Sequence, residues 1–97
     1  MSGYVITNMK IKNHEKYKDY IKSVIPSVKK YKGQYLFRGG RVKKFLEGEW
    51  KYKRLVVIKF PSYKKALDWY NSKDYARIKD IRHKYADSNL VILKGLI

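Results

Sequence analysis

Three patterns in the sequence predict an α+β fold whose elements follow the order β-α-β-β-α-β. Residues 3–12 have the period-two alternation of a strand, and residues 17–31 repeat apolar side chains at helical spacing. Residues 55–58, Leu-Val-Val-Ile, form the short continuous apolar run that is typical of a buried strand. A chain of 97 residues is long enough for one such core, so we expect a single domain spanning residues 1–97.

The first strand and helix follow from residues 3–33. In the strand, predicted from Gly3 to Lys12, alternate residues share a face, and Asn13 is a suitable N-cap for the helix that follows. Gly33 is a natural stop for that helix. One apolar stripe of the helix is expected to face the sheet, and it comprises Tyr17, Tyr20, Ile21, Val24, Val28 and Tyr31.

The middle of the chain predicts a β-hairpin. Its first strand is expected from about Gln34 to Leu46, with a bulge or a close approach at the glycine pair Gly39-Gly40. Leu36 and Arg38 are expected to share a face of this strand. Glu47-Gly48 would form the turn, and the second strand is expected from Trp50 to Phe60, with residues 55–58 buried on both faces.

Two helices and a last strand complete the prediction. Ser62 is expected to cap a helix carrying Ala66, Leu67, Trp69 and Tyr70, and Ser72 to cap a separate helix from Lys73 to about Tyr85. The last strand is expected from Leu90 to Leu96.

The resulting order is that of the ferredoxin-like fold, with an antiparallel sheet covered by helices on one face. The other face would expose apolar side chains of the first, third and fourth strands, a patch that a monomer cannot leave in water. Two sheets facing one another would bury both patches with two-fold symmetry. We therefore expect a homodimer whose two sheets close an α+β barrel.

The charge of the chain is strongly positive. Twenty-four Lys and Arg against eight Asp and Glu give a net charge of +16, which indicates possible binding to nucleic acid or another polyanion. The lysines are spread from Lys10 to Lys94, which favours a solvated basic surface and leaves only nonspecific, salt-sensitive binding as the alternative. An RNA-recognition motif is excluded, because the strand Arg54–Phe60 is aliphatic where base-stacking aromatic rings are required.

Several classes of protein and site are disfavoured. The chain has no cysteine, so it has neither disulfides nor a thiolate metal site, and His14 and His83 each occur without the spacing of metal ligands. No secretory signal or membrane-spanning run is present, so a cytoplasmic location without membrane contact is expected. No nucleotide-binding loop is present, and no cofactor is expected.

A set of spaced residues resembles the domain-of-unknown-function 1330 family of small bacterial proteins over nearly the whole chain. The resemblance implies a dimeric α+β barrel, an architecture shared with antibiotic-biosynthesis-type monooxygenases and muconolactone-isomerase-like proteins, but it transfers no activity. Lys32 departs from the family, which usually has a glycine at this position. The matching residues are Tyr17, Tyr20, Pro26, Tyr31, Gly33, Tyr35, Leu36, Arg38, Gly39, Gly40, Glu47, Gly48, Trp50, Arg54, Phe60, Pro61, Ser62, Ala66, Trp69, Tyr70, Ser72, Tyr75 and Arg82.

The candidate site lies between the helices and the sheet. Arg38, next to two glycines that leave its surroundings open, could hold a carboxylate through two hydrogen bonds. Alternatively, it pairs with an internal acid such as Glu47 or with backbone carbonyls at the bulge. Walls of a pocket are predicted from Tyr17, Tyr20, Trp69 and Tyr70, each with core packing as the alternative.

Other residues have weaker claims to this site. Arg54 opens a strand, and Arg82 could simply lie on a helix surface. The sequence therefore predicts a small anionic or aromatic ligand, and a structural dimer without a ligand remains the alternative. Whether the protein is an enzyme is open; in a cofactor-free enzyme a tyrosine or Glu47 would have to transfer the proton.

Overall fold

The computed structural model describes residues 1–95, and the predicted order of elements is confirmed, with the second helical region divided into two helices as expected. The elements are β1 (Gly3–Ile11), α1 (His14–Lys30), β2 (Gln34–Arg41), β3 (Arg54–Phe60), α2 (Tyr63–Tyr70), α3 (Lys73–Tyr85) and β4 (Ala86–Lys94). The strands form one sheet in the spatial order β2-β3-β1-β4, in which every neighbouring pair is antiparallel. This is the ferredoxin-like α+β fold predicted from the sequence.

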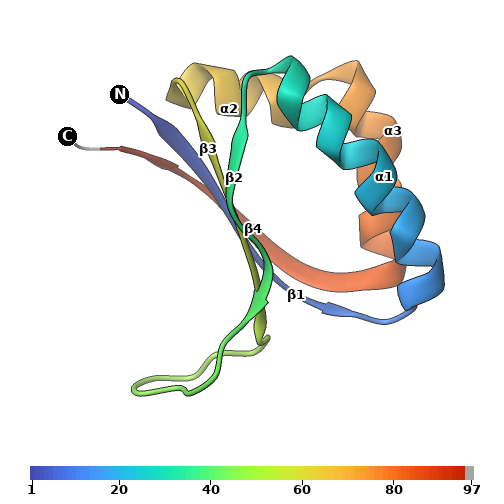
Figure 1. Ribbon diagram of the computed structural model, residues 1–97, viewed down its shortest axis with the longest axis vertical. Helices are drawn as coiled ribbons and strands as arrows, with labels where there is room; N and C mark the ends of the chain where they lie inside the picture. The colour runs from blue at the N-terminus through green and yellow to red at the C-terminus, as the bar shows by residue number, and fades with distance from the viewer. Residues whose placement is uncertain (96–97) are drawn as a thin grey trace.

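The helices cover one face of the twisted sheet (Figure 1). The alternation of β1 places Val5, Thr7 and Met9 on this face, where all three are buried. The predicted stripe of α1 packs over them, with Tyr17, Tyr20, Val24 and Val28 buried and Ile21 and Tyr31 partly buried. The core therefore lies between the helices and the sheet.

The three predicted N-caps are confirmed. The side chain of Asn13 accepts a hydrogen bond from the Lys16 amide at 3.1 Å, and Ser62 accepts one from Lys65 at 3.1 Å. Ser72, which is buried, accepts a hydrogen bond from the Tyr75 amide at 3.1 Å. Each cap satisfies an amide that the helix cannot pair internally, so these side chains set where the helices begin.

The end of α1 differs in detail from the prediction. The residue with left-handed backbone geometry is Lys32, with φ 64°, rather than the following glycine. Gly33 donates its amide hydrogen to the carbonyl oxygen of Val28 at 2.9 Å, which closes the last turn. A Cβ on Gly33 would lie 2.6 Å from the Val28 side chain and 2.7 Å from the Phe60 ring, so this glycine serves a close approach between α1 and the sheet.

Strand β2 contains two irregularities. Its register against β3 shifts between Arg38 and Gly40, as the glycine pair predicts, and also between Tyr35 and Phe37. Because of the shift between Tyr35 and Phe37, the prediction that Leu36 and Arg38 share a face is wrong. The residue that lies with Arg38 on the helix-covered face is Tyr35. An extra residue in a strand reverses the alternation of the residues that follow it.

The hairpin strands are shorter than predicted. β2 ends at Arg41 and β3 begins at Arg54, and residues 42–53, here called the β2–β3 arm, extend away from the body (Figure 1). One backbone hydrogen bond, from the Val42 amide to the Lys53 carbonyl at 2.8 Å, continues the pairing into the arm. The arm has no layer to pack against, and a two-stranded ribbon alone is only marginally stable.

Strand β4 begins at Ala86 rather than at the predicted Leu90, directly after α3. Residues 86–89 are Ala-Asp-Ser-Asn, which lack strand propensity, but they pair with residues 8–11 of β1. The predicted end of the strand at Leu96 lies outside the described residues. No helix in residues 1–95 combines the length and hydropathy needed to cross a membrane.

The face of the sheet without helices carries a continuous apolar row. Phe37 pairs with Val57, Val57 with Ile6, and Ile6 with Val91, so the row crosses all four strands. Phe37 is 59% exposed and Val91 is 52% exposed. The prediction that residues 55–58 are buried on both faces is therefore wrong for the single chain, in which only Ile58 of this run is buried.

Candidate functional site

A cavity of about 310 Å³ lies between the helices and the sheet. Residues from β1, β2, β3, β4 and all three helices line it, and most of the lining is apolar or aromatic. The lining residues are Thr7, Met9, Tyr17, Tyr20, Ile21, Val24, Ile25, Tyr35, Arg38, Gly39, Arg54, Val56, Ile58, Trp69, Arg82 and Leu90.

Aromatic rings with fixed positions form part of the cavity wall. The rings of Tyr17 and Tyr20 lie one helical turn apart on α1, with centroids separated by 5.0 Å. The Tyr17 hydroxyl donates to the Met9 sulfur at 3.0 Å, and the Tyr20 hydroxyl is 2.8 Å from that of Tyr75. The Trp69 indole, 1% exposed, donates its N–H to the Ser27 hydroxyl at 3.0 Å. Paired polar atoms hold these rings in place.

Three guanidinium groups reach this apolar space from three different elements: Arg38 of β2, Arg54 of β3 and Arg82 of α3. Arg82 is the most deeply placed, at 3% exposed, so its suggested position on a helix surface is wrong. Its Nη2 donates to the Nε2 of His83 at 3.2 Å, whereas its buried Nε has no hydrogen-bond partner within the described residues. A buried charged donor without a partner is costly, so an acceptor brought within reach of this atom would be stabilising.

The two other arginines line the cavity where the bulge of β2 opens. Arg38 is largely exposed, and its guanidinium lies over the Tyr35 ring, 5.7 Å from the ring centroid. Gly39 has φ +79°, and a Cβ there would lie 2.5 Å from the Nη2 of Arg54. The missing side chain of Gly39 therefore makes room for the Arg54 guanidinium.

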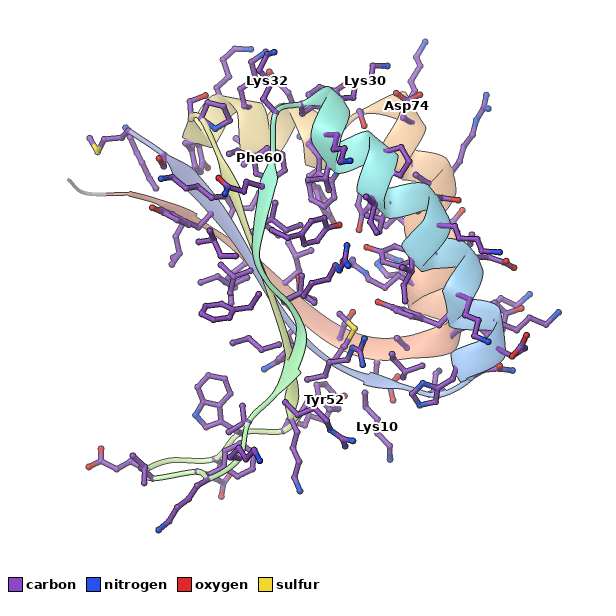
Figure 2. All side chains as sticks on the ribbon, viewed as in Figure 1. Lys10, Lys30, Lys32, Tyr52, Phe60 and Asp74 are labelled. Carbon is purple, nitrogen blue, oxygen red and sulfur yellow. The ribbon has the colours of Figure 1, made fainter. Side chains whose placement is uncertain are left out.

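Within residues 1–95, no carboxylate lines the cavity. The four ion pairs found in residues 1–95 join lysines to acids elsewhere: Lys12–Asp87, Lys18–Glu15, Lys30–Asp74 and Lys64–Asp68. The pair between Lys30 and Asp74 links the end of α1 to the start of α3 (Figure 2). The three arginines of the cavity therefore have no acidic partner in the described chain, which leaves a positive field in a largely apolar space.

The tyrosines of the cavity keep their protons at neutral pH. Burial is the largest cause that raises the pKa of Tyr17 and of Tyr20, and a neighbouring tyrosine is the second largest. The positive charge of Arg82 lowers both pKa values and so partly offsets these shifts. Burial likewise raises the pKa of Tyr35. These hydroxyls are therefore uncharged at neutral pH and do not act as bases, and arginine has no acceptor. The polar lining is thus suited to an anion.

The structure brings together four of the six residues predicted for the site: Tyr17, Tyr20, Arg38 and Trp69 line the cavity. Tyr70 does not line it; this half-buried residue packs against Trp69 and lies beneath the ammonium group of Lys79. Glu47 lies in the exposed β2–β3 arm and is not part of the lining.

Sequence reasoning undervalued Arg82 and did not single out Tyr35. A helical spacing signal was present for Arg82: Tyr75, Ile78 and Arg82 lie on one face of α3, and Tyr75 is fully buried. No comparable signal marks Tyr35, whose inward position depends on the register shift that follows it. In residues 1–95, no group of His, Cys, Asp or Glu side chains is arranged to hold a metal ion.

Solved structures similar to this chain share its fold. A protein of unknown function from Rhodopseudomonas palustris has a TM-score of 0.77 and 17% identity, over 99% of this chain and 83% of that one. A protein from Jannaschia sp., described as dimeric, ferredoxin-like and of unknown function, has a TM-score of 0.75 and 10% identity, over 98% of this chain and 100% of its own. A similarly described protein from Thermobifida fusca has a TM-score of 0.54 and 15% identity, over 98% and 92% of the two chains.

These identities show the fold alone. No curated protein shows significant sequence similarity to the chain. A family model, in contrast, matches residues 2–96, almost the whole sequence, and confirms the resemblance seen in the spaced residues from Tyr17 to Arg82. The chain therefore belongs to the family described as domain of unknown function DUF1330.

Proposed function

We propose that this protein binds a small organic anion with an aromatic or apolar body in the cavity between its helices and its sheet. The observation that carries the proposal is the buried guanidinium of Arg82, which has an unpaired Nε in a lining that contains two further arginines and no carboxylate. A carboxylate would satisfy this donor and neutralise part of the charge. The tyrosine rings and Trp69 would then contact the apolar body.

The lining favours binding over proton-transfer chemistry. The tyrosines are protonated at neutral pH, the arginines carry no free lone pair, and Glu47 is outside the cavity. A general base must lie within hydrogen-bond reach of the proton it removes, and no lining group meets that requirement at neutral pH. We therefore assign the cavity a binding role.

We also propose that two copies of the chain associate through the open face of the sheet. The apolar row Phe37–Val57–Ile6–Val91 has no covering layer in the single chain, and exposed contiguous apolar surface of this kind marks an interaction site. The descriptions of the Jannaschia and Thermobifida proteins as dimeric support a homodimer. The proposed partner is therefore a second copy, related by two-fold symmetry.

The ligand proposal is tested by thermal unfolding and calorimetry with benzoate, phenylacetate, naphthoate and indole-3-acetate, at low and at physiological ionic strength. At least one of these acids is expected to raise the melting temperature. The substitution Arg82→Gln is expected to weaken its binding roughly 10- to 100-fold, since a hydrogen bond to a charged group contributes about 1.5–3 kcal/mol.

Two further variants keep this test decisive. Arg77→Gln removes the same charge from an exposed position of α3 and should leave ligand binding unchanged. Arg38 is exposed, so the Arg38→Gln variant should fold normally. It should weaken ligand binding, and it therefore provides a test even if Arg82→Gln does not fold. Binding that is insensitive to both Arg82→Gln and Arg38→Gln, or a response only to oligonucleotides at low salt, would contradict the proposal and favour nonspecific polyanion binding.

A further inference from the structure

A second hollow adjoins the cavity and is lined mainly by basic side chains. This hollow, here called the basic basin, has a volume of about 400 Å³ and lies where β1, β2, β3 and the β2–β3 arm meet. Two of its residues, Lys10 and Tyr52, lie at the end of the sheet from which the arm extends (Figure 2). The lining residues are Met9, Lys10, Ile11, His14, Arg41, Lys51, Tyr52, Lys53 and Arg54.

The charges of the basin are not balanced within the described chain. Its lining contains Lys10, Arg41, Lys51, Lys53 and Arg54 and no carboxylate. None of these five side chains takes part in the ion pairs found in residues 1–95. Arg41 and Arg54 are direct partners in the register of β2 and β3, so their side chains share a face. Like charges directly opposite one another destabilise a sheet, and a bound anion would remove that repulsion.

The basin and the cavity lie next to each other, because Met9 and Arg54 line both. Met9 and Arg54 are themselves direct partners in the register of β1 and β3. The position of Arg54 follows from Gly39, whose missing side chain leaves room for the guanidinium between the two spaces. A molecule that extends past Arg54 would place its apolar body against Trp69 and Tyr20 and its charged group in the basin.

We infer that the ligand of this protein is an organic phosphate or diphosphate whose apolar body occupies the cavity and whose phosphate occupies the basic basin. The inference rests on the proposed function. A phosphate monoester carries a charge of about −1.5 to −2 at neutral pH and three acceptor oxygens, more than a carboxylate offers. Arginine forks bind phosphate through paired hydrogen bonds, and lysines add point charges, which matches the composition of the basin.

The test compares matched ligands by calorimetry at constant ionic strength. Phenylalkyl phosphates of increasing chain length are compared with phenylalkyl carboxylates of the same lengths and with inorganic pyrophosphate. One phosphate length is expected to bind roughly 10- to 100-fold more tightly than its carboxylate counterpart and than pyrophosphate, because linking two groups makes the second contact intramolecular.

Variants divide the two spaces. The double substitution Arg41→Gln with Lys53→Gln changes the basin alone, and it should abolish the advantage of phosphate while leaving carboxylate binding within about twofold. The substitution Arg82→Gln should weaken both ligand classes. The control is Lys22→Gln with Lys29→Gln, which removes the same charge from exposed positions of α1 and should change neither.

The outcomes separate this inference from the proposed function. If carboxylates bind through Arg82 and phosphates bind no better, the inference fails and the proposed function stands. If pyrophosphate alone binds as tightly as the phenylalkyl phosphates, the joint use of cavity and basin is wrong. If phosphates depend on Arg41 and Lys53 but not on Arg82, the cavity does not hold their apolar body and the inference fails, whereas the proposed function is then decided by the response of the carboxylates to Arg82→Gln and Arg38→Gln. An oligonucleotide that binds as tightly as the best phosphate would also overturn the inference.

Discussion

Tyr75 shows at the residue scale how burial acts on a single ionisable group. It is fully buried, its hydroxyl is 2.8 Å from that of Tyr20, and its ring lies 4.2 Å from the centroid of Trp69. Burial raises the pKa of Tyr75 from 10.0 to about 12, with the positive charge of Arg82 acting in the opposite direction. The folded protein therefore binds the phenolic proton more tightly than the unfolded chain does.

This shift predicts a loss of stability at alkaline pH. Because the folded pKa lies above the unfolded one, the contribution of Tyr75 is complete below about pH 10 and is lost as the pH rises from about 10 to 12. Two pKa units correspond to about 3 kcal/mol. The free energy of unfolding of wild type and of Tyr75→Phe, measured in urea between about pH 8 and pH 12, should fall less steeply with pH for the variant.

The Tyr75→Phe substitution also removes the partner of the Tyr20 hydroxyl, which lowers stability by a constant amount below the titration. The test therefore compares slopes, not absolute stabilities. Parallel pH profiles for the two proteins would show that the Tyr75 hydroxyl does not titrate abnormally.

Residue-scale prediction from sequence succeeded where one periodicity decided the answer. Tyr17 and Tyr20 were placed correctly because the stripe of α1 fixes which of its side chains face the sheet. Arg82 was undervalued because arginine is rarely buried, and the space into which it points is formed by residues distant in sequence.

At the scale of elements, the end of α1 contains a correctable strain. Lys32 adopts φ 64°, which costs a residue with a side chain about 1–2 kcal/mol relative to the right-handed region, whereas glycine has no such penalty. The substitution Lys32→Gly is therefore expected to raise the free energy of unfolding by about 1 kcal/mol. The matched variant Lys29→Gly, inside the helix, should lower it by about 1 kcal/mol. Urea denaturation of both variants measures the change in the free energy of unfolding, which should be positive for Lys32→Gly and negative for Lys29→Gly. A loss of stability in Lys32→Gly would contradict the cap assignment.

The glycine pair of β2 gives a second contrast. Gly39→Ala is expected to destabilise by about 1–2 kcal/mol, because φ is +79° and the new Cβ would meet the Arg54 guanidinium at 2.5 Å. It should also weaken ligand binding by displacing that guanidinium. Gly40→Ala should change stability by less than about 0.5 kcal/mol, since nothing lies within 4 Å of its Cβ position. If Gly39→Ala and Gly40→Ala changed the melting temperature and the ligand affinity by the same amounts, the proposed role of Gly39 would be refuted.

The elements predicted most accurately were those with local start signals. Asn13, Ser62 and Ser72 were identified as caps because a short polar side chain before a helical pattern acts within its own turn. The start of β4 was misplaced because its first residues are held in the strand by pairing with β1 and not by their own propensity. The ends of the hairpin strands were misplaced because residues 42–53 extend away from the rest of the sheet. Ala86, for example, is the register partner of Ile11 in β1, a residue 75 positions earlier in the sequence.

At the scale of the whole molecule, the open face of the sheet predicts self-association. Wild-type protein is expected to sediment with twice the 11.6 kDa mass of the chain. Val91→Asp would place a charge in the apolar row of each copy. Because the two copies are related by two-fold symmetry, two charges would be buried in the interface, and the dissociation constant of the dimer should rise at least about 100-fold. Ala76→Asp, at an exposed position of α3, is the control.

Sedimentation equilibrium over a range of concentrations measures this effect. A wild-type chain that remains monomeric at high concentration, or a Val91→Asp variant that dimerises as well as Ala76→Asp, would refute the proposed interface. The open face itself followed from the sequence, because the first, third and fourth strands carry apolar side chains on both faces while the helices cover only one.

The register of β1 has a consequence for how the chain folds during its synthesis. β1 leaves the ribosome first, yet its two neighbours in the sheet are β3, which begins at Arg54, and β4, which ends at Lys94. Loop-closure entropy must be overcome before such distant pairings form, so the nascent chain carries an unpaired central strand at least until residues 54–60 have emerged. The central strand acquires its second neighbour only when residues 86–94 have emerged, and until then α1 can cover only one of its two faces.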